Sequence, residues 1–359
     1  MSGRIKIVTA AALALAACAE KVDGEPVYSL DQCRRVALIN ASTGKAVVGA
    51  EDLTFDPAMR HVIISAYDRR AVERQAARGA GRLDEGGIYS VPLDVLAGDA
   101  TSLTVSSIVS RDTVVGGLRP HGVAFDEARR EITFVNRSYQ KMYGRWRVSP
   151  RIERAGADGA VFVGDGGAPR CSANDIALIG DRTFVSFDHG SCGWRAGIED
   201  LAAAKASGIE TVDGDTVFDR ARHANGVAAA PGRQLALAST RDKSIVVLAE
   251  EGDGFDVSRE IAVPGGPDNL TVSADGSVVA AVYPSLLTIG AQRRLGLGRS
   301  GSRIVSANLE TGEISLLFND DKGRFFSAAS AGLLAEGLLV MGSALDRGIV
   351  VCKPDSLDR

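Results

Sequence analysis

This 359-residue sequence lacks three features that would assign it to a common functional class. Charge of one sign is not concentrated: 41 lysines and arginines face 45 aspartates and glutamates, for a formal net charge of −4. Nucleic-acid binding needs a basic face and is therefore not expected. No Gly-x-Ser-x-Gly motif occurs, which argues against a serine hydrolase. The long crossover helices that TIM-barrel and Rossmann folds require are also missing.

The first residues have the pattern of an export signal. Arg4 and Lys6 make a short positive start, and residues 7–17 form an apolar run too short to span a bilayer as a helix. The run ends in Leu-Ala-Ala-Cys18, which resembles a bacterial lipobox, where the cysteine thiol becomes lipidated. We therefore expect residues 1–18 to be a lipoprotein signal peptide, with Cys18 anchoring the exported protein in the outer membrane, facing the periplasm. A plain secretory signal with cleavage nearby is the alternative.

Four cysteines remain after Cys18: Cys33, Cys171, Cys192 and Cys352. They allow three connectivities, and an exported, oxidising setting favours disulfides. Because Cys33 lies near the mature start and Cys352 near the end, a bridge between them would close a ring of repeats, leaving Cys171 to pair with Cys192 within one repeat. The alternative is that some of the four remain buried thiols.

One pattern recurs along the chain: a polar residue, a short apolar alternation, a turn, and then an alternating apolar strand. Copies begin at 51, 121, 174, 225, 268 and 331, a mean spacing of about 56 residues, and the last lacks the polar residue. Repeats of this size with hairpin turns predict propeller blades. We therefore expect an all-β, six-bladed β-propeller of four-stranded blades, one domain over 19–359 closed by the terminal disulfide. A β-sandwich, the alternative, would not require the polar residue to recur.

Three segments depart from the strand pattern. Residues 69–85 are rich in Arg, Ala and Gly and are expected to be an exposed insertion. Residues 196–206 have helical composition. Residues 293–303 form a basic, glycine-rich stretch, expected to be a solvated loop, with contact to a membrane surface or a substrate as the alternative.

The recurring polar residues predict a metal site, because equivalent positions in a propeller are related by rotation about its axis. If one of them points into the central channel, all do. The candidate ligands are Glu51, Asn174, Asn225, Asp268 and Asn269. Converging carboxylates repel unless a cation sits among them, and hard oxygen ligands favour Ca²⁺ over Zn²⁺ or Mg²⁺. The alternative is that these residues only begin turns.

Asp52 and Asp175 directly follow Glu51 and Asn174. Neighbours in a strand point to opposite faces, so they cannot serve the same ion without a kink in the strand. A second, deeper calcium ion of structural type explains them, and polar contacts between blades are the alternative.

The same segments resemble motifs of the paraoxonase/arylesterase family, which belongs to the wider group of gluconolactonase and regucalcin-like propellers. The segments are GAEDL at 49–53, RPHGV at 119–123, SANDI at 172–176, FDH at 187–189, ANG at 224–226 and PDNL at 267–270. The resemblance covers nearly the whole mature chain, and Cys33 and Cys352 sit like the family's terminal disulfide.

The resemblance implies two calcium ions and hydrolysis of lactones and aryl esters, with organophosphates as promiscuous substrates of some members. The ligands of the catalytic ion would be Glu51, Asn174, Asn225, Asp268 and Asn269. Those of the structural ion would be Asp52, Asp175 and the backbone carbonyl of Val123. His121 matches the family's active-site histidine.

One departure concerns proton transfer, because Arg137 stands where the family has the second histidine of a proposed dyad. Arginine cannot relay a proton at neutral pH, so either His121 acts alone or Asp268 is the base. We expect Asp188 and His189 to support the calcium ligands through hydrogen bonds.

The remaining histidines, His61 and His223, are expected not to be catalytic. The predicted activity is hydrolysis of a small-molecule lactone or ester in which Ca²⁺ polarises the carbonyl. The alternative is a non-catalytic, calcium-stabilised envelope propeller that binds a ligand or a protein partner. Membrane contact is expected only through the N-terminal lipid.

Overall fold

The computed structural model describes residues 24–110, 114, 116–157, 162–167, 169–252 and 254–354, with the side chains of 162–166 left out of the description. The predicted signal peptide at 1–18, with Cys18, lies outside these residues. Among the described residues, no helix has both the length and the apolar character needed to cross a bilayer.

Four separate antiparallel sheets of four strands follow one another along the chain. The first contains β6 (Pro120–Asp126), β7 (Glu131–Asn136), β10 (Arg151–Gly156) and β11 (Phe162–Gly167). The second contains β12 (Ala173–Ile179), β13 (Arg182–Phe187), β14 (Ser207–Thr211) and β15 (Thr216–Ala221). The third contains β16 (Ala224–Ala230), β17 (Gln234–Ser239), β18 (Ser244–Glu251) and β19 (Gly254–Ala262). The fourth contains β20 (Gly266–Val272), β21 (Val278–Tyr283), β22 (Ser302–Ala307) and β23 (Ile314–Asp320).

An eight-stranded sheet holds both the first and the last strands of the chain, in the order β4-β3-β2-β25-β26-β1-β5, with β24 paired to β25. Its early strands are β1 (Cys33–Asn40), β2 (Val48–Asp56), β3 (His61–Ala66), β4 (Gly87–Pro92) and β5 (Ser102–Val105). Its late strands are β24 (Ala329–Ala335), β25 (Leu338–Arg347) and β26 (Ile349–Cys352). Because β1 pairs antiparallel with β26, the two ends of the described chain are joined by hydrogen bonds.

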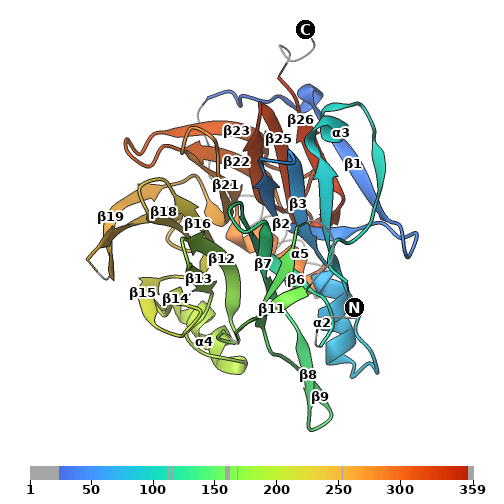
Figure 1. The fold of residues 1–359 in the computed structure, drawn as a ribbon, viewed down its shortest axis with the longest axis vertical. Coiled ribbons are helices and arrows are strands. Elements are labelled where there is room, and N and C mark those ends of the chain that lie inside the picture. The colour runs from blue at the N-terminus through green and yellow to red at the C-terminus, as the bar shows by residue number, and fades with distance from the viewer. Residues whose placement is uncertain are drawn as a thin grey trace, which may run out of the picture.

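The sheets form a propeller-like, all-β arrangement around a common centre (Figure 1). The number of sheets does not by itself establish six blades. Four sheets are separate, and the eight-stranded sheet combines strands from the beginning and the end of the chain. The six predicted strand pairs are all confirmed: each expected first strand pairs antiparallel with the strand after its turn. Apolar clusters fill the spaces between successive sheets, so an inner strand such as β21 is buried at every position.

Both predicted disulfides are present. Cys33 and Cys352 lie opposite each other in the β1–β26 ladder, with their Cα atoms 4.0 Å apart. Cys171 is bonded to Cys192 within the stretch of chain that forms the β12–β15 sheet. The Cys33–Cys352 bond therefore reinforces the β1–β26 ladder, which joins the first and last strands of the chain beside the β2–β25 pairing.

The helices partly correct the expectations for the irregular segments. Residues 69–85 contain α2 (Arg69–Ala77), on which Arg69 and Val72 are buried, so this insertion is not simply exposed. α4 (Trp194–Ala202) agrees with the helical composition of its segment. Short elements complete the chain: η1 (Leu30–Gln32), α3 (Leu93–Ala97), and a hairpin of β8 (Tyr139–Met142) and β9 (Arg145–Val148).

The expectation of a solvated loop over 293–303 is confirmed only for 296–299, which form an exposed irregular stretch, and it is wrong for both ends of the segment. Arg293 belongs to α5 (Leu286–Leu295), which lies over the centre of the ring (Figure 1). Arg303 lies in β22 and is fully buried, with its guanidinium hydrogen-bonded to the Pro264 carbonyl and 2.6 Å from an Asp321 carboxylate oxygen. These partners offset the cost of burying its charge.

Replacing both Cys33 and Cys352 by serine should lower the free energy of unfolding by about 2–5 kcal/mol, because the unfolded chain loses its longest cross-link. The two residues are 319 apart in sequence, whereas Cys171 and Cys192 are only 21 apart. The matched Cys171→Ser/Cys192→Ser protein should therefore lose less. Urea unfolding midpoints of the three oxidised proteins check this, and equal losses would contradict it.

Candidate active site

Each first strand carries a β-bulge at its recurring polar residue. In β2, Ala50 pairs with Ala66 but Asp52 pairs with Ser65, so Glu51 is an extra residue without a partner in the β2–β3 ladder. The same register shift occurs at the polar position of every other first strand, β6, β12, β16, β20 and β24. A bulge re-aims side chains and breaks the alternation between strand faces. The bulge in β2 is the kink that allows two consecutive residues, Glu51 and Asp52, both to lie at the centre of the ring.

The bulge in β24 identifies a residue that the sequence pattern missed. The shift falls between Ala329 and Ala331, so the position equivalent to Glu51 is Ser330, one residue before the predicted start of the last copy. Ser330 is fully buried, and its hydroxyl donates to the Glu51 carbonyl at 2.7 Å. The sequence had indicated that the last repeat lacks the polar residue. The structure shows that it has a small polar residue, Ser330, at this position.

The first strands of neighbouring sheets meet closely at the centre. A Cβ atom at Gly122 would collide with the backbone of Asp175, and one at Gly226 with the backbone of Asn269. Hydroxyl groups also link neighbouring sheets: the Ser65 hydroxyl donates to the His121 carbonyl, and similar bonds run from Ser186 to Asn225 and from Thr240 to Pro267. Little free space therefore remains between the bulges.

Asp52 and Asp175 form a deep carboxylate pair. Asp52 accepts the backbone N–H of Val123 at 2.8 Å, and Asp175 accepts that of Val227 at 2.8 Å. Burial raises the pKa of both carboxyl groups, that of Asp175 to about 7, and the charge of Asp175 raises the pKa of Asp52 further. The structure thus brings Asp52, Asp175 and the Val123 N–H together, and binding of a second ion by Asp52, Asp175 and the Val123 carbonyl stays a prediction.

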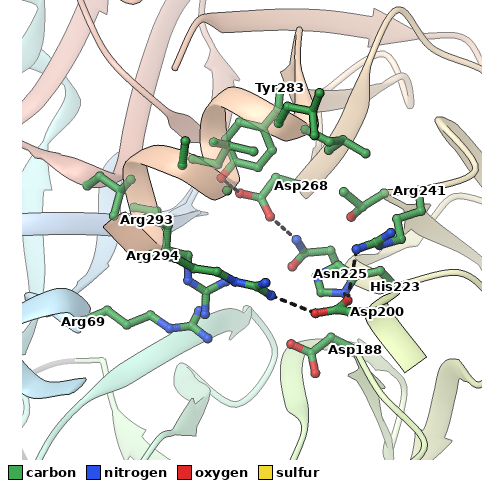
Figure 2. Close-up of a pocket in the computed structure, with 18 of the residues that line it drawn as sticks. Arg69, Asp188, Asp200, His223, Asn225, Arg241, Asp268, Tyr283, Arg293 and Arg294 are labelled. Atoms are coloured by element: carbon green, nitrogen blue, oxygen red, sulfur yellow. Dashed lines mark hydrogen bonds and ion pairs between the residues drawn. The ribbon is translucent and has the colours of Figure 1, made fainter. Parts of the chain in front are cut away.

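Four of the other predicted ligands, all except Asn269, line a cavity of about 590 Å³. Asp268 lies between Asn225 and Tyr283 and accepts a hydrogen bond from each, one on either carboxylate oxygen (Figure 2). Burial and then the charge of Glu51 raise the pKa of Asp268 to about 8. Tyr283, which the sequence did not single out, is the last residue of β21.

Glu51 and the two remaining amides complete this set. Asn174 lines the same cavity as Glu51, and the side-chain amide of Asn269 donates to the Glu51 carbonyl at 2.9 Å. Glu51 is buried, and its Oε2 atom has no hydrogen-bond partner among the described residues. An unpaired buried carboxylate oxygen among oxygen donors fits a hard cation such as Ca²⁺.

His121 lies beside Glu51, with 3.5 Å between its Nδ1 and Glu51 Oε1. It is buried, and neither ring nitrogen has a hydrogen-bond partner within the described part of the chain. Burial, and after it the positive charges of Arg69, Arg137 and Arg293, hold the pKa of His121 well below its ordinary value. The imidazole is therefore neutral at pH 7 and able to accept a proton.

Arginines line part of the cavity wall. None of them had been predicted from the sequence as a site residue. Arg69 on α2, Arg293 and Arg294 on α5, and Arg241 reach toward the cavity (Figure 2). The charge of Arg69 and, after it, burial lower the pKa of Arg293. The signals of this wall in the sequence were the basic stretch at 293–303 and the Arg-rich stretch at 69–85.

Asp188 and His189 were expected to support the calcium ligands through hydrogen bonds, but of the two only Asp188 lines the cavity. Asp188 lines the cavity together with Asn174 and Asn225. His189 instead turns toward α4: its Nδ1 lies 2.6 Å from Asp188 and its Nε2 lies 3.2 Å from Asp200. Support of the calcium ligands by these two residues stays a prediction.

Comparison with known proteins identifies the fold. Neither a protein-family profile nor a curated protein sequence matches the chain. A gluconolactonase from Xanthomonas campestris is similar in structure, with a TM-score of 0.51 and 15% identity over 94% of this chain and 99% of that chain. A virginiamycin B lyase from Staphylococcus aureus gives a TM-score of 0.48 and 12% identity over 89% and 98%. At such low identity, the likeness to the gluconolactonase shows a shared fold and carries no activity with it.

The calcium-free protein should become less stable as pH rises. Folded Asp175 and Asp268 hold protons up to pH values of about 7 and 8, whereas the same carboxyls ordinarily titrate near 3.8. Because the folded state binds more protons between these limits, the free energy of unfolding falls by a few kcal/mol from about pH 4 to about pH 8. Urea unfolding of metal-free protein at pH 5 and pH 8 measures this.

Asp175→Asn is the matched control for this pH dependence, because it removes one titrating group and keeps its shape. Its unfolding free energy should vary less with pH than that of the unaltered protein. An undiminished dependence in this variant, or a rise in stability with pH in the unaltered metal-free protein, would contradict the assignment.

Proposed function

We propose that the chain is a calcium-dependent hydrolase of lactones or aryl esters, built on six blades. Six blades result when the eight-stranded sheet is divided into β2-β3-β4 and β24-β25-β26-β1, with β5 as an additional strand paired to β1. The one bulge in each of six first strands supports this count. The motifs that resemble the paraoxonase/arylesterase family lie on these strands, and a neighbour of the same fold is a gluconolactonase.

Two calcium ions belong to the proposal. The carboxylates and amides around the cavity, those of Glu51, Asn174, Asn225, Asp268 and Asn269, would hold one ion. Asp52, Asp175 and the carbonyl of Val123 would hold the second below it. When bound, the ion in the cavity supplies positive charge to a substrate carbonyl oxygen. The observation that carries this proposal is the unpaired Oε2 of Glu51 beside the unpaired ring of His121 in a setting of oxygen donors.

The chain's own residues supply the proton transfer. Asp268 already accepts hydrogen bonds from Asn225 and Tyr283 on its two oxygens. His121 is neutral and has both ring nitrogens unpaired among the described residues, so it is the better placed of the two to take a proton from the attacking water. Arg69 and Arg293 at the cavity wall would then stabilise the carboxylate that hydrolysis releases.

A second candidate function is a non-catalytic, calcium-stabilised propeller that binds a ligand or partner. Arg137 favours it, since this buried arginine, bonded to the Ala173 carbonyl at 3.3 Å, stands where a second histidine would complete a dyad. Both candidates include export to the cell envelope with a lipid on Cys18, and the two disulfides are consistent with an oxidising compartment.

Turnover of lactones and aryl esters should be lost on chelation and restored by Ca²⁺. Asp268→Asn should lower kcat/KM by about 100-fold or more, because it removes a negatively charged ligand. Asp94→Asn, the same change at an exposed ion pair with Arg60, should leave kcat/KM unchanged. Steady-state kinetics with calcium titration measures these effects. Calcium binding without turnover of any lactone or ester would establish the non-catalytic alternative.

Arg137→Gln should move the acidic limb of the pH dependence of kcat/KM to higher pH, by up to about one unit. The reason is that the charge of Arg137 helps to hold the pKa of His121 down, so its removal lets that pKa rise. Arg137→Lys keeps the charge and should leave the limb in place. If Gln and Lys behave alike, His121 is not the base.

A further inference from the structure

Beside the cavity, three side chains from three separate segments converge in a second cluster of different chemistry. His189 follows β13, Asp200 lies on α4, and His223 precedes β16. Nε2 of His189 lies 3.2 Å from Asp200 Oδ1, and Nδ1 of His223 lies 3.5 Å from the same oxygen (Figure 2 shows Asp200 and His223). One ligand atom from each of the three residues lies within 4.8 Å of the others.

These separations match the edges of a tetrahedral metal site. Zinc binds histidine nitrogen and carboxylate oxygen at about 2.0–2.1 Å, which places tetrahedral ligands about 3.3 Å apart. The two measured separations, 3.2 and 3.5 Å, fall on either side of that value. The two ring nitrogens are also buried, and each contacts Asp200 Oδ1 as an ion pair rather than as a well-aligned hydrogen bond.

Surrounding contacts hold the cluster in place. The Nδ1 atom of His189 lies 2.6 Å from Asp188 Oδ1, the carboxylate–histidine pairing that orients metal-binding imidazoles. The hydroxyl of Ser172 donates to the His189 carbonyl, and the Cys171–Cys192 disulfide closes this segment. The backbone N–H of Gly190 donates to a carboxylate oxygen of Glu199 at 2.9 Å, which joins the segment to α4. The ligands therefore belong to anchored parts of the fold.

Two arginines also contact Asp200 and compete with a cation there. Arg294 lies 3.0 Å from its Oδ2, and Arg241 lies 3.4 Å from its Oδ1. Both guanidiniums are at least one-third exposed, and the Arg294 side chain is 71% exposed. Arg294 contacts Oδ2, whereas Arg241 shares Oδ1 with the two histidines. A metal ion on Oδ1 therefore requires the partly exposed Arg241 side chain to swing toward solvent.

We propose that His189, Asp200 and His223 bind one divalent transition-metal ion, with Zn²⁺ as the expected occupant. Imidazole ligands select such ions over Ca²⁺, so the site is distinct from the oxygen donors at the centre. Asp200 and His223 also line the main cavity, so a further ligand of the ion would come from that side. Three protein ligands and an open position are typical of zinc sites that bind a further molecule. This site does not depend on the proposed lactonase activity.

Cobalt(II) tests the site, because its visible ligand-field bands report tetrahedral nitrogen coordination. Folded protein is kept in excess Ca²⁺, titrated with Co²⁺, and then with Zn²⁺. We expect bands that saturate at about one equivalent of Co²⁺ and disappear as Zn²⁺ displaces it. His189→Gln, His223→Gln and Asp200→Asn should each weaken Co²⁺ binding more than tenfold, and Asp188→Asn by about 10–100-fold.

His61→Gln is the matched control, since His61 lies elsewhere on β3 with its Nδ1 2.8 Å from Ser90 Oγ. It should bind Co²⁺ like the unaltered protein. Circular dichroism and Ca²⁺ binding identify variants that fail to fold, and the remaining ligand variants then decide. The proposal is overturned if the unaltered protein shows no tetrahedral bands, if folded ligand variants keep them, or if His61→Gln loses them. An arginine–aspartate–histidine ion-pair network alone would give the first of these results.

Discussion

Repulsion between buried carboxylates at the centre is the constraint on which the rest of the structure depends. Glu51, Asp52, Asp175 and Asp268 are all buried there, and burial raises the pKa of each. Four such groups cannot all be ionised at neutral pH without a cation among them. The surrounding amides and backbone N–H groups soften the repulsion but add no positive charge. Without a cation some of these groups must hold protons, and the fold around them must keep together oxygens that would otherwise separate.

Closure of the ring of sheets keeps these carboxylate oxygens in place. The first strands converge through bulges and through hydroxyl-to-carbonyl bonds between neighbouring sheets, so each sheet is positioned by the next. Such an arrangement opens unless its ends are joined. The β1–β26 ladder and the Cys33–Cys352 bond join them. Stability at the periphery and geometry at the centre are thus coupled, because loosening the closing ladder would let the carboxylates move apart.

Two chemistries meet at one cavity. The bulges at the centre offer carboxylate and amide oxygens together with the single imidazole of His121, whereas the wall near α4 offers two imidazoles around Asp200. Hard and borderline cations prefer these two sets respectively, so the fold can separate them by ligand type alone. The arginines of α2 and α5 add positive charge at the entrance, where an anion would arrive or leave.

Much of the fold and part of the candidate site could be predicted from the sequence, because the patterns that indicate them are local. Alternation and turn residues determined the six strand pairs, recurrence placed five polar positions, and the positions of the cysteines in the chain indicated both disulfides. Tertiary structure alone decided the rest. The bulges at Glu51 and Ser330 depend on register, and the burial of Arg303 depends on partners supplied by other segments. His189, Asp200 and His223 meet because the β13–β14 connection with α4 packs against the segment before β16. No periodic pattern encodes such contacts, because they arise only when distant segments are packed around one axis.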